Sequence, residues 1–387
     1  MKVLKICVGD WENASRDKRE LSTVRELGHE VEVVAKGERS GVVDDVAGFK
    51  VTRLSSRPLG EKIPVSLNRG LSMLTWASYV RKRDDVDVIS GHDYLALTIG
   101  YLSNIGKKKK SMLVYDSHEF ELGRNAKRGK LAYWCVCHLE RFLMKRCAFS
   151  IMVNDAIADE VQQIHRLKER PVVVRSTPSY WKLEEQRTVQ TRRELLSQLG
   201  ASEDAFLVMY HGAIAPGRGI EQMLCAIKNV PCAVSVILGN GDAGYIEKLG
   251  DLCKEQNISD RVLFHSAVPI EVLKNYVSAA DVGVMTVLGR AKSYYYMLPN
   301  KFFENIQSLT PVIVSDFPSI GAIVDQYEIG LKVDPESPEA IAAAIRRMRE
   351  DQAFYAACKE NLKQAKEELC WEKEKLVLQE AYRRILI

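Results

Sequence analysis

The sequence predicts an α/β protein made of two doubly wound, parallel-sheet domains in series. Short runs rich in valine and isoleucine alternate with longer helical segments, which is the pattern of a parallel sheet covered by helices on both faces. The alternation stops at a polar segment, residues 176–204, and then starts again. A chain of 387 residues is roughly two to three times as long as a typical domain, so two domains are expected.

The first series of strands and helices precedes the polar segment. Its helices are expected at residues 16–28, 66–83, 94–105 and 129–147. Its strands are expected at residues 2–8, 29–35, 86–90, 111–116, 149–153 and 171–175. These strands are almost continuously apolar, as strands buried on both faces of a sheet are.

The second series follows the polar segment and repeats the pattern. Its strands are expected at residues 206–212, 233–239, 261–266, 281–286, 311–315 and 330–333. We place the domain boundary near residues 180–200. The predicted parts are an N-terminal domain at 1–185, a C-terminal domain at 186–365, and a C-terminal helix at 366–387 that packs back toward the N-terminal domain.

The composition is that of a globular protein. Hydrophobic residues make up 46% of the chain and charged residues 27%, and the formal net charge of +4 is too small to indicate nucleic-acid binding. No apolar run reaches the roughly 18 residues of a membrane-spanning helix, and the N-terminus lacks the apolar core of a signal peptide. The nine cysteines are scattered, which favours reduced thiols. We therefore expect a cytoplasmic protein.

No metal site and no cofactor are predicted. Cys135, Cys137 and His138 form a cluster of ligand-type side chains, but no second ligand pair follows at the spacing of a zinc site. Asp85 and Asp87 precede or open their strand, whereas a metal-binding Asp-x-Asp pair would follow a strand. We interpret these aspartates as solvated groups.

The turns that follow strands in the second domain combine glycines with charged side chains. Ligands of open α/β sheets bind beyond the carboxyl ends of the strands. Gly212, Gly217 and Gly219 let the backbone approach a ligand closely, and Arg218 stands at the mouth of the next helix. A helix N-terminus together with a guanidinium makes an anion site.

A second turn, after the strand at 281–286, brings Asn300, Lys301 and Glu304 to the same edge. These groups fit a bound nucleotide, with its phosphates on helix ends and a carboxylate on the ribose diol. The alternative for Glu304 is a solvated helix face or a favourable charge near a helix N-terminus.

At this point the residues resemble glycosyltransferase family 4. The segments that carry the resemblance are, in order, YHGAIAPGRGIEQML, ILGNGD, RVLFHSAVPIEVLKNYVSAADVGVM and LPNKFFENIQSLTPVIVSD. It continues more loosely at LGHEVEVVA, LVYDSHEF and the closing WEKEKLVLQEAYRRIL. The resemblance implies the GT-B architecture, in which two Rossmann-like domains face each other across a cleft. It also implies a nucleotide-sugar donor bound by the C-terminal domain and an acceptor approached from the N-terminal domain.

The resemblance assigns roles to individual residues of the C-terminal domain. Glu304 matches the carboxylate that binds the donor ribose, and Arg218 matches a basic residue on the diphosphate. Gly212, Gly217, Asn300 and Lys301 complete the predicted donor site.

In the N-terminal domain, His118 of YDSHEF resembles the active-site histidine that faces the sugar, and its alternative is a satisfied loop histidine. Glu119 is a weaker candidate for orienting the acceptor. Arg16 and Arg19 are acceptor-side candidates that would offer their charge to phosphates or simply start a solvated helix.

The sequence departs from the family pattern at Tyr296, at Ala213 and at the N-terminal Gly-rich loop, in whose place ENASRDKRE stands. Tyr296 stands where the family commonly has a carboxylate on the donor sugar, and Ala213 stands where an arginine is often found. The expected function is a retaining, metal-independent transfer of a sugar from a nucleoside-diphosphate sugar, UDP first and GDP second, to a hydroxyl acceptor in cell-envelope or polysaccharide synthesis. The alternatives are a non-catalytic nucleotide-sugar-binding module and a GT-B epimerase.

A basic and apolar stretch in the N-terminal domain predicts a docking surface for an anionic membrane. Residues 51–83 contain apolar Leu71, Met73, Leu74 and Trp76 among basic residues, and a second basic run follows at 107–110. The basic residues of the first stretch are Arg53, Arg57, Lys62, Arg69, Arg81, Lys82 and Arg83. Docking would place a sugar or lipid-linked glycan acceptor at the inner face of the cell membrane. The alternative is a charged helix whose apolar side chains pack into the core.

Overall fold

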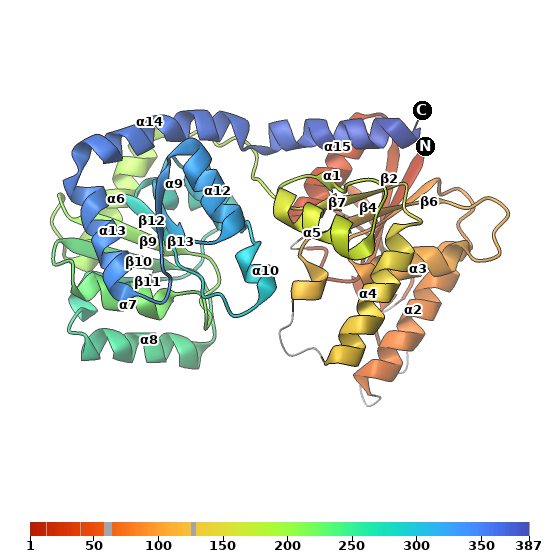
Figure 1. Ribbon diagram of the computed structural model, residues 1–387, viewed down its shortest axis with the longest axis horizontal. Coiled ribbons are helices and arrows are strands. Elements are labelled where there is room, and N and C mark those ends of the chain that lie inside the picture. The colour runs from red at the N-terminus through yellow and green to blue at the C-terminus, as the bar shows by residue number, and fades with distance from the viewer. Residues whose placement is uncertain (13, 39, 58–63, 125–128, 387) are drawn as a thin grey trace. The chain divides into compact units, whose positions relative to one another are not determined.

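The computed structural model describes residues 1–12, 14–38, 40–57, 64–124 and 129–386 (Figure 1). Contacts divide the chain into two units. The first unit contains Met1–Arg175 and Glu374–Ile387, and the second contains Ser176–Lys373. The predicted boundaries, after residues 185 and 365, lie several residues from these divisions.

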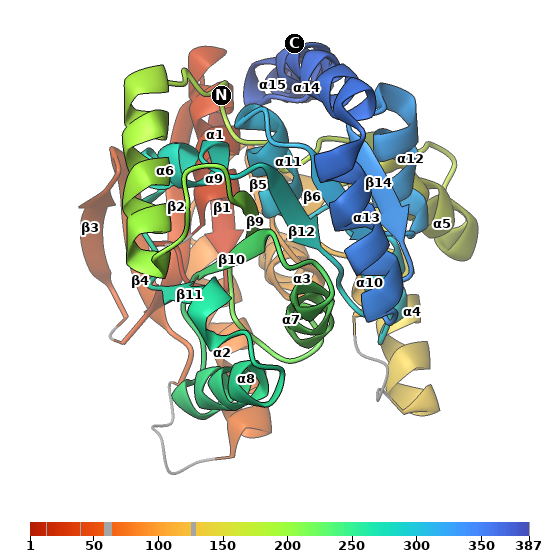
Figure 2. The ribbon, with the colours of Figure 1, turned by 90° about the vertical axis from the view of Figure 1, so that its left-hand side faces the viewer.

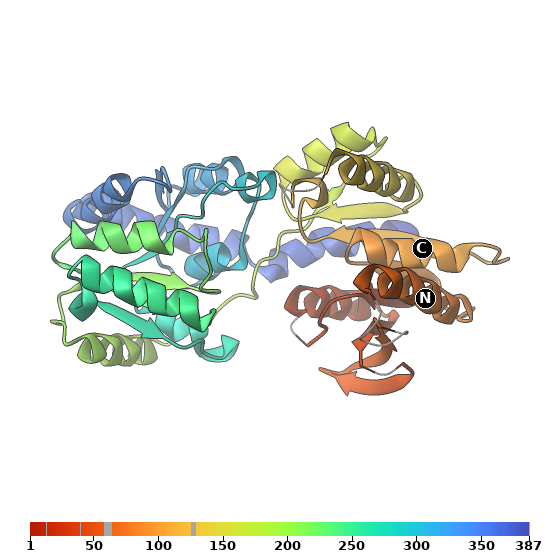
Figure 3. The same cartoon turned by 90° about the horizontal axis from the view of Figure 1, so that it is seen from below.

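The first unit is built on a mainly parallel sheet in the order β3-β4-β2-β1-β5-β6-β7-β8. Its strands are β1 (Lys2–Cys7), β2 (Glu30–Gly37), β3 (Val42–Val46), β4 (Phe49–Ser55), β5 (Val88–Gly91), β6 (Met112–Ser117), β7 (Phe149–Met152) and β8 (Val172–Val173). Among the strands of the described residues, only β3 runs antiparallel to its neighbour, β4. The sequence did not predict this hairpin, which lies at the edge of the sheet (Figure 2 and Figure 3). An edge strand has an exposed side, so the polar residues of VVDDV hide its strand signal.

Helices connect the strands of the first unit. They are α1 (Ser15–Glu26), α2 (Val65–Arg81), α3 (Tyr94–Asn104), α4 (Lys130–Met144) and α5 (Asp155–His165). Two of them begin at side-chain caps: Asp93 accepts a hydrogen bond from the Ala96 amide, and Asn154 accepts one from the Ile157 amide. Such caps satisfy amide groups that the first turn of a helix leaves without partners.

The second unit contains a fully parallel sheet in the order β11-β10-β9-β12-β13-β14. Its strands are β9 (Phe206–His211), β10 (Ala233–Leu238), β11 (Val262–His265), β12 (Val282–Met285), β13 (Val312–Ser315) and β14 (Gly330–Val333). Its helices are α6 (Glu185–Leu199), α7 (Ile220–Lys228), α8 (Ala243–Glu255), α9 (Ile270–Ser278), α10 (Lys292–Tyr295), α11 (Asn300–Gln307), α12 (Pro318–Tyr327), α13 (Pro338–Glu350) and α14 (Gln352–Glu368). Helix α6 occupies part of the predicted polar connector. The strand order reverses between β9 and β12, which is where α/β sheets bind ligands.

The side chains of β9 contribute to the hydrophobic clusters on both faces of the sheet in the second unit. Phe206, Val208 and Tyr210 pack into a cluster with α7 and α13 on one face, whereas Leu207 and Met209 pack against α6 and α9 on the other. Every residue of the strand is buried. A strand buried on both faces must be apolar throughout, which is why its sequence shows no alternation.

Helix α15 (Trp371–Leu386) ends the chain against the first unit. The ring of Tyr382 packs edge-on against Phe149, with 5.3 Å between ring centroids. Glu374 accepts hydrogen bonds from the backbone and side chain of Arg175, and Lys375 pairs with Glu26 at 3.0 Å. Among the described residues, none of the helices has the length and apolar character needed to span a bilayer.

Candidate active site

The turn after β9 requires glycine at more than one position. Gly212 and Gly219 have positive φ angles of 114° and 76°. A β-carbon on Gly219 would lie 1.8 Å from the carbonyl oxygen of Thr286, and one on Gly239 would lie 1.9 Å from the carbonyl oxygen of Gly212. The close contacts pack this turn against the ends of β10 and β12. The edge where these strands end therefore presents backbone groups directly.

Glu304 lies at this edge and is not a solvated helix residue. Its Oε2 atom is 3.0 Å from Nε2 of His211, the last residue of β9, and its side chain is only 14% exposed. A carboxylate can only accept, so His211 donates from Nε2. One oxygen of Glu304 is thus fixed and the other remains able to accept hydrogen bonds from a ligand. The sequence analysis missed His211, although its place directly after a buried strand is the signal that selected the other residues.

Two cationic side chains lie near Glu304. The Lys301 ammonium is 4.0 Å from the centroid of the Tyr210 ring, and its stem passes Gly212. Burial and the charge of Arg218 lower the pKa of Lys301 to about 7, against the opposing effect of Glu304. In the described part of the chain, Arg218 has no carboxylate within ion-pair distance. The positive charges of Arg218 and Lys301 repel each other, and an anionic ligand bound between or beside them would relieve that repulsion.

The remaining predicted donor residues lie around the same turns. Gly217 is buried beside the side chain of Arg290, a cation that the sequence analysis did not single out. Asn300 is the exposed first residue of α11. Ala213 has a carbonyl that accepts a hydrogen bond from the Tyr210 hydroxyl at 2.6 Å, and Tyr296 follows α10 with Lys292 near its ring.

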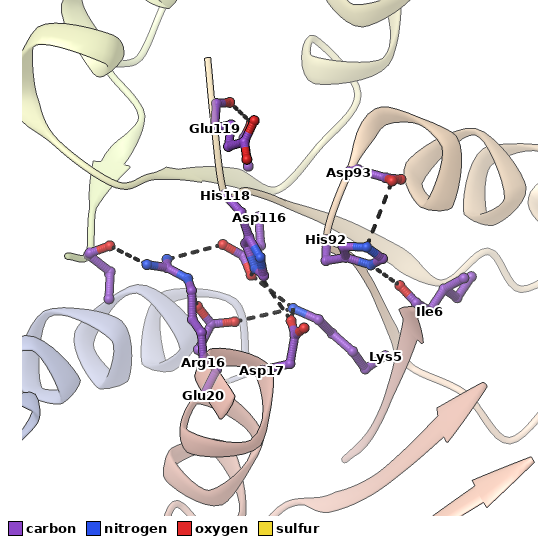
Figure 4. A network of polar contacts seen from close by, with 12 residues as sticks. Lys5, Ile6, Arg16, Asp17, Glu20, His92, Asp93, Asp116, His118 and Glu119 are labelled. Atoms are coloured by element: carbon purple, nitrogen blue, oxygen red, sulfur yellow. Dashed lines mark hydrogen bonds and ion pairs between the residues drawn. The ribbon is translucent and has the colours of Figure 1, made fainter. Parts of the chain in front are cut away.

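The first unit holds a buried network of charges at the carboxyl ends of its strands (Figure 4). The Lys5 ammonium contacts Asp17 at 2.6 Å, Asp116 at 2.9 Å and Glu20 at 3.2 Å. Arg16 is also buried. Its guanidinium contacts Asp116, Glu20 and the carbonyl of Val174. Arg16 therefore does not start a solvated helix, and its donors are engaged inside the protein instead of being offered to a phosphate.

His118 lies at the solvent-exposed side of this network and contacts two of its carboxylates. Its Nε2 atom is 2.9 Å from Asp116 and 3.5 Å from Asp17, and its side chain is 30% exposed. Burial by itself lowers the pKa of His118, but the charges of Asp116 and Asp17 raise it to about 10. The imidazole is therefore a cation at neutral pH. His118 is partly open to solvent, and its role at the sugar stays a prediction.

His92 lies beside His118 and was missed by the sequence analysis. It follows β5, the strand next to β6, and the two ring centroids are 5.6 Å apart. Its Nδ1 atom is 3.1 Å from the carbonyl oxygen of Ile6. The motif SGHDY places a histidine directly after a strand, as YDSHEF does for His118, so the same rule applied to β5 would have found it.

The other acceptor-side candidates differ in exposure. Glu119 is exposed and pairs with Arg124 at 2.9 Å. Arg19 is partly buried in α1.

Ligand-type side chains converge in the first unit, but their charges are already matched. Atoms of Asp17, Glu20, Asp116 and His118 lie within 4.8 Å of one another, a spacing that suits a metal ion. The Lys5 ammonium already contacts all three carboxylates, and Arg16 and His118 bring two more positively charged side chains to them. The absence of a metal site stays a prediction.

Among the described residues, the group of ligand-type side chains at metal-binding spacing includes none of the residues from the two clusters that the sequence analysis rejected. Cys135 is exposed and Cys137 is buried. Asp85 pairs with Lys2, and Asp87 pairs with Lys109.

The predicted docking residues are arranged differently from the expectation. Trp76 is 3% exposed and donates its indole N–H to the carbonyl of Ser55, so for this residue the core-packing alternative is right. Leu71 and Met73 are partly buried, whereas Leu74 is 59% exposed.

Ion pairs occupy much of the basic run. Arg53 pairs with Asp44 and Glu12, and Arg83 pairs with Glu32 and Asp85. Lys107 pairs with Asp84, and Lys109 pairs with Asp87. Arg69, Arg81 and Lys82 are exposed, and Lys62 lies outside the described residues.

Comparison with known proteins matches both halves of the chain to sugar-transfer families. The model described as "Glycosyltransferase Family 4" matches residues 21–178, and the model described as "Glycosyl transferases group 1" matches residues 191–365. An uncharacterized glycosyltransferase of Methanocaldococcus jannaschii is 24% identical over 342 residues, which are 84% of this chain and 82% of that protein.

Solved structures give the same fold over the whole chain. Sucrose-phosphate synthase of Thermosynechococcus elongatus aligns with a TM-score of 0.78 at 19% identity. The HepE protein of Anabaena, solved in complex with UDP, aligns with a TM-score of 0.78 at 15% identity. Each alignment covers 100% of this chain and 99% of the other.

Proposed function

Because this chain belongs to the group 1 glycosyltransferases and has their GT-B fold, we propose that it transfers a sugar from a nucleoside-diphosphate sugar to a hydroxyl acceptor. The observation that carries the proposal is the pair of Glu304 and His211 at the end of β9, with Lys301 and Arg218 nearby. A fixed carboxylate next to two cations is complementary to a ribose joined to a diphosphate. The UDP complex of HepE supports UDP as the first choice of donor, with GDP second.

Each donor-site residue has a distinct role in this proposal. The free oxygen of Glu304 accepts hydrogen bonds from the ribose hydroxyls. Arg218 and Lys301 neutralise the diphosphate, and the backbone at Gly212 and Gly217 lets it approach the turn. Fixed positive charges stabilise the diphosphate as it leaves, which lowers the barrier to transfer without a metal ion.

We propose transfer with retention of anomeric configuration, by attack of the acceptor oxygen on the face from which the diphosphate departs. The bond between the anomeric carbon and the phosphate oxygen breaks with its electron pair going to the diphosphate. The acceptor oxygen forms the new bond, and its proton passes to the leaving phosphate. The His118 imidazolium would face the sugar, and Glu119, exposed beside it, would orient the acceptor.

A panel of nucleotides tests the donor assignment. UDP, GDP, CDP and ADP are added separately, and thermal unfolding is recorded with and without the Glu304→Ala substitution. A ligand at a hundred times its dissociation constant stabilises the fold by about 2.7 kcal/mol. We expect UDP to raise the melting temperature of the unaltered protein and to do so much less in the variant. No shift with any nucleotide would contradict the proposal.

The departures at Tyr296 and Ala213 favour a second candidate, a nucleotide-sugar-binding module without catalysis. A phenol cannot accept hydrogen bonds as a carboxylate does. Steady release of UDP from UDP-glucose in the presence of an acceptor sugar distinguishes the candidates, because a binding module releases none. A GT-B epimerase would release nucleotide without any acceptor.

We further propose that the acceptor is a sugar or lipid-linked glycan at an anionic membrane, in cell-envelope or polysaccharide synthesis. The surface that supports docking differs from the one predicted. We define the basic–apolar surface by exposed residues in the N-terminal parts of α2 and α4, namely Leu67, Arg69, Leu74, Lys130, Leu131, Tyr133 and Trp134. Leu131 is 75% exposed and Trp134 is 57% exposed.

Charge on the basic–apolar surface matches an anionic partner. Helix α2 contains no acidic residue, and the one acidic residue of α4, Glu140, is buried. Both helices begin at the same end of the first unit, and α3 packs between them (Figure 1). Apolar side chains surrounded by basic ones are typical of surfaces that bind anionic lipid headgroups.

A further inference from the structure

The loop that follows β12 lies against the glycine turn of the proposed donor site. The Leu288 amide donates a hydrogen bond to the carbonyl oxygen of Gly217 at 3.0 Å. A β-carbon on Gly219 would lie 1.8 Å from the carbonyl oxygen of Thr286, so only glycine leaves room for this loop. Both contacts hold the loop beside the first turn of α7, where amide groups without intrahelical partners favour an anion.

Arg290 follows this fixed stretch and extends along the same turn. Its amide donates to the carbonyl oxygen of Leu288 at 2.8 Å, which fixes the backbone from which the side chain starts. A β-carbon on Gly217 would lie 3.6 Å from Cδ of Arg290 and 3.7 Å from its Nε and Cζ atoms. The guanidinium of Arg290 therefore lies next to the backbone of the glycine turn.

No acidic group of the described residues neutralises Arg290. Its side chain is exposed, and within those residues no carboxylate lies within ion-pair distance of it, that of Glu221 in the first turn of α7 included. Burial and the Glu221 carboxylate raise the pKa of Tyr245 in α8, and the charge of Arg290 opposes that rise. Arg290 is thus near enough to α7 and α8 for its charge to act there, and its guanidinium is available to a ligand.

Three cations from different elements border this one turn. Lys301 borders it from α11, Arg218 belongs to it, and Arg290 borders it from the loop after β12. The turn itself contains Ala213 at the position where the family often has an arginine. Arg290 therefore brings, from another part of the chain, a positive charge that the turn lacks.

We propose that Arg290 binds the diphosphate of the donor and takes the place of the arginine that is missing at Ala213. A guanidinium donates two parallel hydrogen bonds to a phosphate group, which fixes its orientation as well as its charge. The diphosphate gains negative charge as its bond to the sugar breaks, so a fixed cation beside it also stabilises the leaving group. This inference rests on the proposed function, because it assigns a further residue to the same donor site.

Neutral and charged substitutions separate the charge of Arg290 from its packing. Arg290→Met keeps an unbranched stem against Gly217 and removes the guanidinium, whereas Arg290→Lys keeps the charge. In calorimetric titrations we expect UDP affinity to fall about tenfold in Arg290→Met and much less in Arg290→Lys. The control is Lys248→Met, which removes an exposed cation from α8. A UDP affinity of Arg290→Met equal to that of the unaltered protein would overturn the proposal.

Uridine shows whether the lost affinity comes from the phosphates. This nucleoside has the base and the ribose of UDP but no phosphate, so its affinity should be the same in Arg290→Met and in the unaltered protein. An equal loss of affinity for uridine and UDP would mean that the substitution disturbs the turn instead of removing a phosphate contact, and the proposal would be wrong. Failure of the unaltered protein to bind either compound would instead refute the proposed function.

An arginine introduced at Ala213 tests the exchange of one cation for the other. Ala213 is exposed, and its backbone carbonyl, which accepts from the Tyr210 hydroxyl, is kept in any substitution. We expect Ala213→Arg to raise the UDP affinity of Arg290→Met about tenfold and that of the unaltered protein by less, because Arg290 already serves the phosphates there. A gain of the same size in both proteins, or no gain in either, would show that the two positions do not serve the same phosphates.

Discussion

Two side chains near the strand ends, Glu304 and His118, each have one polar atom hydrogen-bonded to a buried partner. His211 holds one oxygen of Glu304, and Asp116 holds one nitrogen of His118. In each pair, the partner leaves the other polar atom of the functional side chain for a ligand. Both arrangements follow from the parallel sheet, since the carboxyl ends of neighbouring strands meet at one edge.

Replacing Glu304 tests its role in nucleotide binding. Glu304→Ala removes the carboxylate that would accept hydrogen bonds from the ribose hydroxyls. The substitution leaves no cavity in the hydrophobic core, because Glu304 is partly exposed. Loss of a hydrogen bond to a charged group costs about 1.5–3 kcal/mol, so we expect UDP affinity to fall roughly ten- to a hundredfold. Calorimetric titration of UDP measures the change. The control is Glu271→Ala, an exposed glutamate in the first turn of α9; equal affinities in the two variants would contradict the role.

Because the pKa of Lys301 is lowered to about 7, we expect the protein to take up a proton at Lys301 when it binds a nucleotide. Its pKa of about 7 leaves a large fraction uncharged at pH 8, and a bound diphosphate would raise that pKa by favouring the charged form. UDP affinity should therefore fall as the pH rises from 7 to 8.5. Calorimetry in buffers of different ionisation enthalpy measures the proton directly. Lys301→Arg keeps the charge but does not titrate in this range, so it should bind UDP without proton uptake.

Residue identities explain which parts of the site the sequence could predict. Arg218, Lys301, Glu304 and His118 follow predicted strands in motifs that resemble a family. Lys5 lies inside an apolar strand, and nothing in KVLKICV reveals that three carboxylates surround it. Long-range contacts of that kind join α1, β1 and β6, and only the folded sheet brings them together.

Elements are held together at the active edge of the first unit by charge as well as by apolar packing. The network of Lys5, Arg16, Asp17, Glu20 and Asp116 connects β1, α1 and β6. Removing one partner from such a network leaves a buried charge uncompensated, which costs about 3–5 kcal/mol. Its members are therefore mutually dependent, and the stability of these three elements depends on pH.

Raising the pH should destabilise the first unit through His118. A group whose pKa is raised on folding stabilises the fold fully below its unfolded pKa and loses that effect as the pH rises through the folded pKa. For His118 this interval runs from the ordinary value of 6.5 to about 10. Between pH 7 and 8.5 the loss is at most about 2 kcal/mol. Thermal unfolding should show a fall in melting temperature over this range, with a smaller fall in His118→Gln. Identical pH dependence in both proteins would disprove the coupling.

The burial of an element decides how well sequence predicts it. Strands β9, β10, β12 and β13 of the second unit are buried on both faces and form nearly continuous apolar runs. All of the strands that were expected in this unit from the sequence were found. The β3–β4 hairpin and α6 were missed. Strand β3 is exposed and contains two aspartates, so its sequence lacks a strand pattern. The sequence analysis placed most of β4 in the basic stretch that begins at residue 51 and placed α6 in the polar connector.

The whole molecule carries the basic–apolar surface on its first unit and the proposed nucleotide site on its second. We expect the protein to co-sediment with anionic liposomes at low salt and to be released as salt rises, since exposed charges are screened beyond about 10 Å at 0.1 M. Replacing Leu131 and Trp134 with serine should reduce binding. The control is replacement of Leu376, which is exposed on α15. Equal binding to neutral and anionic vesicles, or none to either, would favour an acceptor that is not in a membrane.

The first unit also depends on a distant part of the chain. A chain cut after Lys373 lacks Tyr382, whose ring is buried against Phe149. Loss of a large buried aromatic side chain costs about 3–5 kcal/mol, so the first unit should unfold at a lower temperature. UDP should still stabilise the second unit of the shortened chain. Tyr382→Phe in the full chain keeps the ring, so this variant should retain most of the stability of the unaltered protein. A shortened chain as stable as the full one would show that the helix is dispensable.

This discontinuity has a consequence for the order of events during synthesis. A ribosome releases residues 1–175 first, but the helix that completes their unit follows only after all of the second unit has been made. The second unit is continuous in sequence and can therefore reach its final form while the earlier one is still waiting for its last element. The nascent N-terminal part is exposed to chaperones and proteases for that interval, which slower translation of residues 176–373 would lengthen.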